Sequence, residues 1–183
     1  MTSGTDLARA VLLDGFQRIE EGVRNVLEGL HADDLVWRPG PGANPVGWLL
    51  WHLSRQQDAQ LAAIAGEEEV WLAGGWRERF DLPYGPDAHG YGQAVDEVGR
   101  FTIEDPSLLT GYAAAVRDLT ARLLASLGEE DYARVVDDSW DPPVTAAVRI
   151  YSVLEDAAKH LGQAEYVKGL LLAGRDAPSR RSP

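Results

Sequence analysis

The sequence contains no cysteine among its 183 residues. A chain without cysteine forms no disulfide, offers no thiolate ligand to a metal and has no cysteine nucleophile. Any thiol chemistry in this chain therefore requires a thiol supplied from outside. Histidine is also scarce, so candidate histidine sites form a short list: His31, His52, His89 and His160.

Cations are outnumbered in this chain, which has 17 Lys plus Arg against 29 Asp plus Glu and a formal net charge of −12. Nucleic-acid binding depends on clustered cations that neutralise phosphates, so the composition disfavours a nucleic-acid partner. The sequence also lacks any run of the roughly 18 apolar residues that a membrane-spanning helix requires. Its first residues, MTSGTDLARA, lack the basic start and apolar stretch of a secretory signal. We therefore expect a cytoplasmic protein that binds neither nucleic acid nor membrane.

Apolar residues at helical spacing are what the sequence does contain. Over residues 12–30 they recur every three or four positions, as on an amphipathic helix. A second helix is expected to have Asn44 as its cap and Pro45 at its first position, and to end near Gly66. Similar patterns predict a third helix from the segment EDPSLL onward and a fourth over residues 145–174.

Four long helices in a chain of this length predict one all-α domain, a four-helix bundle over residues 1–174, with residues 175–183 as a disordered tail. Bundles commonly build metal and ligand sites from inward side chains of facing helices. The segment GGWRERFDLPYGPDAHGYGQ forms a long loop between helices 2 and 3 and is a candidate lid or pocket wall. It also permits an up-up-down-down helix order. DSWDPPVTAAVR is expected to form a second rim element before the last helix.

The last predicted helix carries a carboxylate and an imidazole four residues apart, Asp156 and His160, on a partly apolar face. Polar groups on such a face must be paired, liganded or poorly buried. One reading is a buried Asp–His hydrogen bond. The other is a pair of metal ligands completed by His52 of the second helix. Two imidazoles and a carboxylate suit zinc, nickel or iron(II) and leave positions open for water or substrate.

Two further residues are candidates for supporting this site. Arg55, one turn from His52, is suited to binding a carboxylate of a thiol or substrate, although an ion pair with Asp58 or a loop acid fits the spacing equally well. Gln163, one turn beyond His160, is placed to orient a ligand or a metal-bound water, or else marks the boundary between surface and core.

The segments NPVGWLLWHLSRQQD and EDAAKHLGQAEYVKGLL, with LVWRPGPGANP before them, resemble the DinB/YfiT-like metal-binding bundles. Among these they look most like the branch of mycothiol-dependent maleylpyruvate isomerases. The resemblance implies that His52 and His160 are metal ligands. It makes Asp156 the third ligand, where the closest isomerases place a glutamate and many other members a histidine.

This resemblance implies an enzyme that uses a divalent metal, zinc first, to activate a low-molecular-weight, mycothiol-like thiol. The thiol would be transferred to a small electrophile or promote its isomerisation. Isomerases of the branch carry an additional C-terminal domain, whereas this sequence predicts a bundle alone. A stand-alone bundle better resembles the thiol transferases of the superfamily. A non-catalytic metal-binding or stress-related interaction protein is the alternative. A homodimer is also expected from the resemblance.

Overall fold

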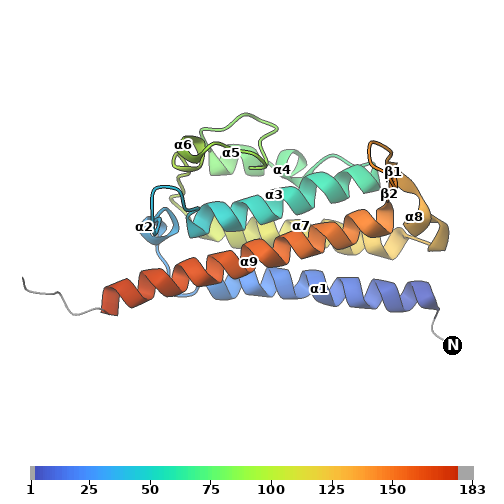
Figure 1. The fold of residues 1–183 in the computed structure, drawn as a ribbon, viewed down its shortest axis with the longest axis horizontal. Coiled ribbons are helices and arrows are strands. Elements are labelled where there is room, and N and C mark those ends of the chain that lie inside the picture. Colours follow the sequence, from blue (N-terminus) through green and yellow to red (C-terminus); the bar gives the residue numbers. More distant parts are fainter. Residues whose placement is uncertain (1–2, 177–183) are drawn as a thin grey trace, which may run out of the picture.

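Four long helices form the body of the protein in the computed structural model, which describes residues 3–176 (Figure 1). They are α1 (Gly4–Leu27), α3 (Val46–Ala65), α7 (Ser107–Ser126) and α9 (Ala146–Asp176). The predicted all-α bundle is therefore confirmed. The described residues add one two-stranded hairpin and several short helices to it. No helix in this described part of the chain is both long and apolar enough to cross a membrane.

The four helices pack in a ring in which α3 and α1 each contact both α7 and α9. Gly15 and Gly22 of α1 face Leu154 and Leu161 of α9 in the same order, so these two helices are parallel. In contrast, α3 runs antiparallel to α9 and parallel to α7 (Figure 1). The helix order is thus up-down-down-up rather than up-up-down-down. The difference arises because residues 28–45 return α3 antiparallel to α1, which leaves the long loop to join two parallel helices.

The helix ends follow local chemistry, with two differences from the sequence-based boundaries. Helix α3 begins one residue later than expected, because Pro45 has an extended conformation (ψ 158°) and is itself the cap in place of Asn44. Gly66 ends α3 in the left-handed region at φ 69°, as a glycine readily does. Helix α9 continues to Asp176, two residues past its expected end. The rest of the predicted tail, residues 177–183, lies outside the described residues.

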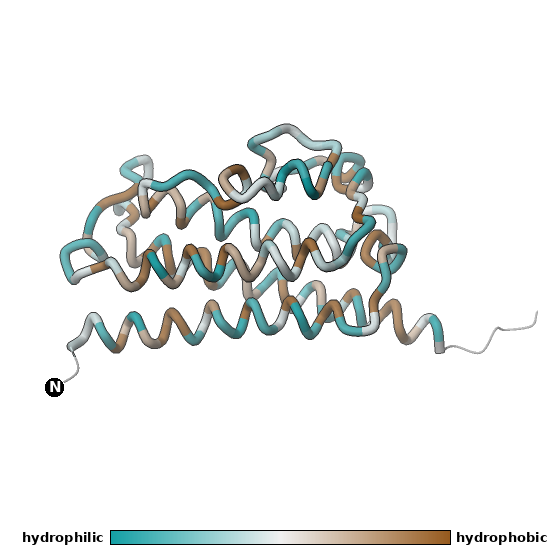
Figure 2. The backbone as a smooth tube through the Cα atoms, turned by 180° about the vertical axis from the view of Figure 1, so that it is seen from behind, coloured by the Kyte–Doolittle hydropathy of each residue, from teal (hydrophilic) through white to brown (hydrophobic). Residues whose placement is uncertain are grey.

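Two apolar clusters, both in contact with the partly buried Leu154, fill the space between the helices. Their largest fully buried members include Trp51, Phe16 and Tyr112. Burying a side chain of this kind stabilises the fold by about 1.5–3 kcal/mol. Figure 2 shows apolar and polar stretches alternating along the long helices, the pattern expected of helices with one buried face. At the α1–α9 contact, a Cβ on Gly22 would lie 2.4 Å from Leu161 Cδ2, so glycine is what allows these helices to approach closely.

The connection from α3 to α7 contains the short helices α4 (Val70–Ala73), α5 (Trp76–Phe80) and α6 (Val95–Val98). Trp71 and Phe80 pack against Tyr112 of α7, with ring centroids 5.2 and 6.0 Å from it. These contacts hold the connection against the bundle beside α3 (Figure 1). The segment expected to be a lid or pocket wall therefore lies over one side of the second bundle helix.

The remaining elements are located near the two ends of the bundle. Helix α2 (Ala32–Leu35) lies between α1 and α3. Helix α8 (Glu129–Ala133) is followed by the antiparallel hairpin of β1 (Val135–Asp137) and β2 (Val144–Thr145). This hairpin, whose turn includes the segment DSWDPP, lies against the start of α9. It occupies the position in the chain of the expected second rim element.

Candidate metal centre

Three potential ligands meet where α3 and α9 pack against each other. His52 comes from α3, and Asp156 and His160 lie one turn apart on α9. One potential ligand atom from each residue lies within 4.8 Å of those of the other two. His160 Nε2 lies 3.6 Å from Asp156 Oδ1, and the two imidazole ring centroids are 4.6 Å apart. The structure thus brings together all three residues that the sequence singled out as ligands.

Exposure increases across the group from the core toward solvent. His52 is 4% exposed, whereas the side chains of His160 and Asp156 are 18% and 41% exposed. Asp156 and His160 are therefore less buried than the reading as a buried Asp–His hydrogen bond requires. The 3.6 Å separation between His160 and Asp156 is also too long for the buried hydrogen bond considered as the alternative. The three residues form a site that is open on the Asp156 side.

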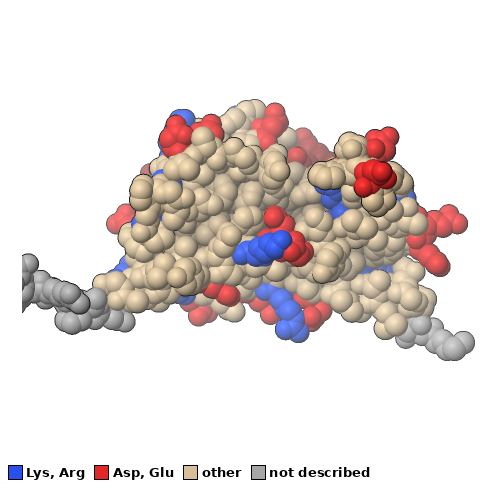
Figure 3. Space-filling model, in the orientation of Figure 1, with Lys and Arg blue, Asp and Glu red and all other residues tan. Residues whose placement is uncertain are grey.

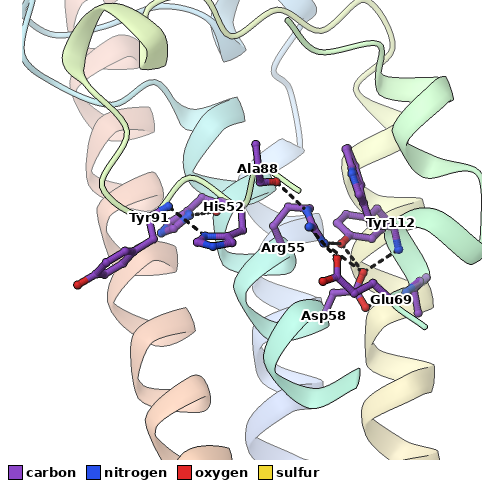
Figure 4. Close-up of polar contacts among 10 residues, drawn as sticks. His52, Arg55, Asp58, Glu69, Ala88, Tyr91 and Tyr112 are labelled. Carbon is purple, nitrogen blue, oxygen red and sulfur yellow. Dashed lines mark hydrogen bonds and ion pairs between the residues drawn. The ribbon is translucent and has the colours of Figure 1, made fainter. Parts of the chain in front are cut away.

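The loop after α5 sets the orientation of the His52 ring. Nδ1 of His52 lies at hydrogen-bond distance from the backbone carbonyl of His89 (Figure 4). A carbonyl only accepts, so this contact requires the tautomer with the proton on Nδ1, which leaves the lone pair on Nε2. Trp48 stacks on the other side of the ring, with centroids 4.6 Å apart and planes at 18°. Both contacts restrict rotation of the ring and leave Nε2 as the free nitrogen.

His160 is oriented in the same way by a residue of its own helix. Its Nδ1 lies 2.9 Å from Oε1 of Gln163. With the amide oxygen as acceptor, Nδ1 carries the proton and Nε2 is available for a ligand bond. Metal-binding histidines commonly donate their second ring N–H to an oxygen in this manner. Gln163 therefore occupies the position expected of a group that orients a ligand.

The protonation state of His52 also fits a ligand. Burial lowers the pKa of His52 to about 4, an effect to which the neighbouring His160 adds. The ring is consequently neutral near pH 7, the form in which imidazole binds a metal. Two imidazoles and one carboxylate are a donor set found in catalytic zinc and iron(II) sites with open positions. The residues present are thus suited to a divalent cation.

Two residues of the loop contact His52 through their backbone. Because a backbone contact does not depend on the type of side chain, the sequence alone could not have identified them. One is His89, whose carbonyl contacts His52. The other is Gly90, which has φ +92° and lies so close to α3 that a Cβ would be 2.5 Å from His52 Nδ1 and 2.9 Å from Trp48 Cζ2. Trp48 Nε1 also donates to Gln93 Oε1 at 2.8 Å. The loop is therefore held directly against the buried side of the site.

Arg55 does not join the three ligands but lies in a separate buried cluster (Figure 4). It is 0% exposed, and its guanidinium contacts Glu69 at 2.8 Å, Tyr112 Oη at 3.2 Å and Asp58 at 3.5 Å. Its Nε donates to the carbonyl of Ala88 at 3.2 Å. These partners leave no side of the guanidinium open to a ligand. Arg55 therefore makes the ion pairs with Asp58 and a loop acid, Glu69, that its spacing also allowed beside the binding of a thiol or substrate carboxylate.

This cluster explains how the loop stays over the site. Carbonyls of two consecutive loop residues accept from side chains one turn apart on α3, Ala88 from Arg55 and His89 from His52. Asp58 in turn accepts from the backbone N–H groups of residues 70 and 71 at 2.9 and 2.7 Å. Both ends of this part of the connection are therefore fastened to α3 by buried polar contacts.

Comparisons with known proteins agree with the fold. A family model described as the DinB superfamily matches residues 16–164. A crystal structure described as a conserved protein from Enterococcus faecalis is 30% identical, with a TM-score of 0.85 over 90% of this chain and 96% of that chain. A search of curated proteins finds no match. From the family match and the shared architecture, the chain belongs to the DinB superfamily.

Proposed function

We propose that this protein is a divalent-metal-dependent enzyme that activates a low-molecular-weight thiol for transfer to, or isomerisation of, a small electrophile. The observation that carries the proposal is the meeting of two oriented imidazoles and one carboxylate at a place open to solvent. A chain without cysteine supplies no thiol of its own, so the thiol comes from outside. Zinc is the proposed metal, with nickel and iron(II) also suited to this donor set.

Each of the three ligands contributes differently to the proposed site. His52 and His160 would hold the cation through Nε2, since their Nδ1 atoms are engaged. Asp156 would add a negative charge and, being the most exposed of the three, lies on the side where ligands enter. A bound divalent cation supplies two kinds of chemistry here, favouring the thiolate form of a thiol ligand and polarising a carbonyl. The loop at His89 and Gly90 keeps water from the opposite side of His52.

The proposed cosubstrate is a mycothiol-like thiol, on the resemblance of the two ligand helices to the mycothiol-dependent branch. A free thiol is mostly protonated at neutral pH, whereas the thiolate is the nucleophile. A metal site that activates an external thiol needs no nucleophile from the protein. This suits the chain, which offers no cysteine or serine–histidine nucleophile at this place. Thiol transfer to a carbon electrophile is the reaction that the proposal places first.

The experiment uses cobalt(II)-loaded protein, because a thiolate bound to cobalt gives a charge-transfer absorption that water does not. Thiols are titrated into wild type, His52→Ala, His160→Ala and His31→Ala. His31 is an exposed histidine at the start of α2 and serves as the matched control. We expect the new absorption in wild type and His31→Ala and its absence in both ligand variants. Consumption of thiol and electrophile is then measured with the zinc-loaded forms.

The outcomes separate the proposal from its alternative. Thiol-dependent turnover by wild type and His31→Ala, lost in the ligand variants, supports an enzyme. Stoichiometric cobalt with no spectral response to any thiol, and no turnover, would make the protein a non-catalytic metal-binding member of the superfamily. In that case the proposed metal site would be correct and the proposed thiol reaction would be wrong.

A further inference from the structure

A groove lies between α3, the early part of α9 and the β-hairpin, and its lining includes the loop residue His89, whose carbonyl contacts His52. Its volume is about 450 Å³, within the range of roughly 300–1,000 Å³ typical of small-molecule sites. Its polar lining is supplied by α3, the loop, the hairpin and α9: Gln56, Gln60, His89, Arg134, Asp137 and Arg149. Alanine and valine side chains of α3 and β1 complete it.

The near end of this groove adjoins the metal centre. Gln56 lies one turn after His52 on α3, and His89, whose carbonyl contacts His52, also lines the groove. The far end is at Arg149, seven residues before Asp156 on α9, which corresponds to a rise of about 10 Å. A ligand lying along the groove would therefore have one end near the metal ligands and the other near the hairpin.

The far end of the groove carries positive charge in an otherwise acidic protein. Arg149 is fixed by Asp137 at 2.7 Å and by Gln60 Oε1 at 2.9 Å. Arg134 donates to the carbonyl of Ile64 at 3.1 Å, and within residues 3–176 it has no carboxylate partner at ion-pair distance. Two arginines and one aspartate leave this end with one excess positive charge, against −12 for the chain. Figure 3 shows basic atoms on this face close to the hairpin, with acidic atoms on the hairpin beside them.

We propose that this groove binds an anionic small molecule, with its carboxylate held by Arg134 and its reacting end directed at His52, Asp156 and His160. The inference rests on the proposed function and names the substrate class. Arg134 supplies the charge, since its guanidinium keeps donors beyond the one used on Ile64. Arg149, fixed by its own partners, forms the wall beside it. Preferred reactants are elongated, since Arg149, which lines the same groove as Arg134, lies a rise of about 10 Å along α9 from Asp156.

The test is a titration with succinate, followed by NMR of the backbone amides, in wild type, Arg134→Gln and Arg18→Gln. Glutamine retains a donor for the Ile64 carbonyl and removes only the charge. Arg18 is an exposed arginine on α1, its side chain 74% exposed, and is the matched control. Succinamide, the neutral counterpart of succinate, is titrated in parallel. His52→Ala is included so that the groove is tested without an intact metal centre.

We expect succinate to shift amides of α3 and β1 around Gln60 and Val136 in wild type, Arg18→Gln and His52→Ala. Arg134→Gln should bind about tenfold more weakly or worse, the loss of one charge-assisted contact. Succinamide should cause no shifts there. No succinate binding by wild type, equal binding by Arg134→Gln, or equal binding of succinamide would overturn the inference. Because His52→Ala retains the groove, such a failure is distinct from failure of the metal centre.

A second arm identifies which reactant carries the carboxylate. Succinate is titrated again into zinc-loaded protein in the presence of 8-mercaptooctanoate, an elongated thiol with a carboxylate at its other end, and in the presence of octanoate, which lacks the thiol. Stronger competition by 8-mercaptooctanoate than by octanoate would assign the groove to the thiol, and equal competition would assign it to the electrophile. Both results require the anion site at Arg134 and support it.

Discussion

The substitution Gly90→Ala tests whether the loop orients the candidate ligand His52. A Cβ at position 90 would lie 2.5 Å from His52 Nδ1. That is about 1 Å inside the 3.5–4.0 Å separation preferred by non-bonded atoms, so the ring or the loop must move. Either movement breaks the contact of Nδ1 with the His89 carbonyl. Loss of such an orienting partner typically weakens metal binding about 10–100-fold.

Gly92→Ala is the matched control for this prediction. Gly92 also has a positive φ, +71°, but nothing lies within 4 Å of a Cβ built on it. Both substitutions carry a backbone strain of about 1–3 kcal/mol, whereas only Gly90→Ala reaches the site. Zinc affinity is measured by competition with a chromophoric chelator, and helix content by circular dichroism. We expect helix content to stay close to wild type in both, with affinity reduced only in Gly90→Ala. Equal zinc affinity of the two variants would refute the role assigned to the loop.

Three further predictions concern other parts of the chain. Arg55→Met leaves the buried Asp58 and the partly exposed Glu69 without a counter-charge and should lower the free energy of unfolding by about 3–5 kcal/mol in a urea titration, against less than about 0.5 kcal/mol for the exposed Arg18→Met. Gln163→Ala removes the oxygen that orients the candidate ligand His160, so zinc affinity should fall about tenfold or more while the melting temperature is unchanged. The pKa of Asp34 is lowered chiefly by the hydrogen bond from the His31 amide. As pH falls below about 4, the Asp34 carboxylate therefore takes up a proton in the unfolded state before it does so in the folded state. The free energy of unfolding of wild type should consequently fall more from pH 5 to pH 3 than that of Asp34→Asn.

The four long helices were predictable because their apolar stripes follow the helical period over many turns. For the same reason, Asp156 and His160 could be placed on one face, since residues four apart are neighbours on any helix. The period does not say which faces of two helices meet. Pairing His52 with the α9 residues was one of two readings of the sequence, the resemblance to the superfamily favoured it, and the structure supplies the packing that brings them together.

Other features depended on tertiary contacts that no local pattern encodes. Arg55 fits a ligand-binding role by its spacing, yet the connection after α3 folds back and buries it against Glu69 and Asp58. The carbonyl of His89 orients His52, but a backbone oxygen is common to every residue and leaves no mark in the sequence. Gly90 is one of 19 glycines, and only the close approach of the loop to α3 distinguishes it.

The most direct test of the metal centre is the metal content of the protein after incubation with zinc and removal of the excess, determined by elemental analysis. Wild type and the control His31→Ala should each retain about one equivalent, as expected of a single three-ligand site. His52→Ala and His160→Ala should retain none while keeping their helix content. Wild type without zinc, or ligand variants that keep the full equivalent, would contradict the assignment of His52, Asp156 and His160 as metal ligands.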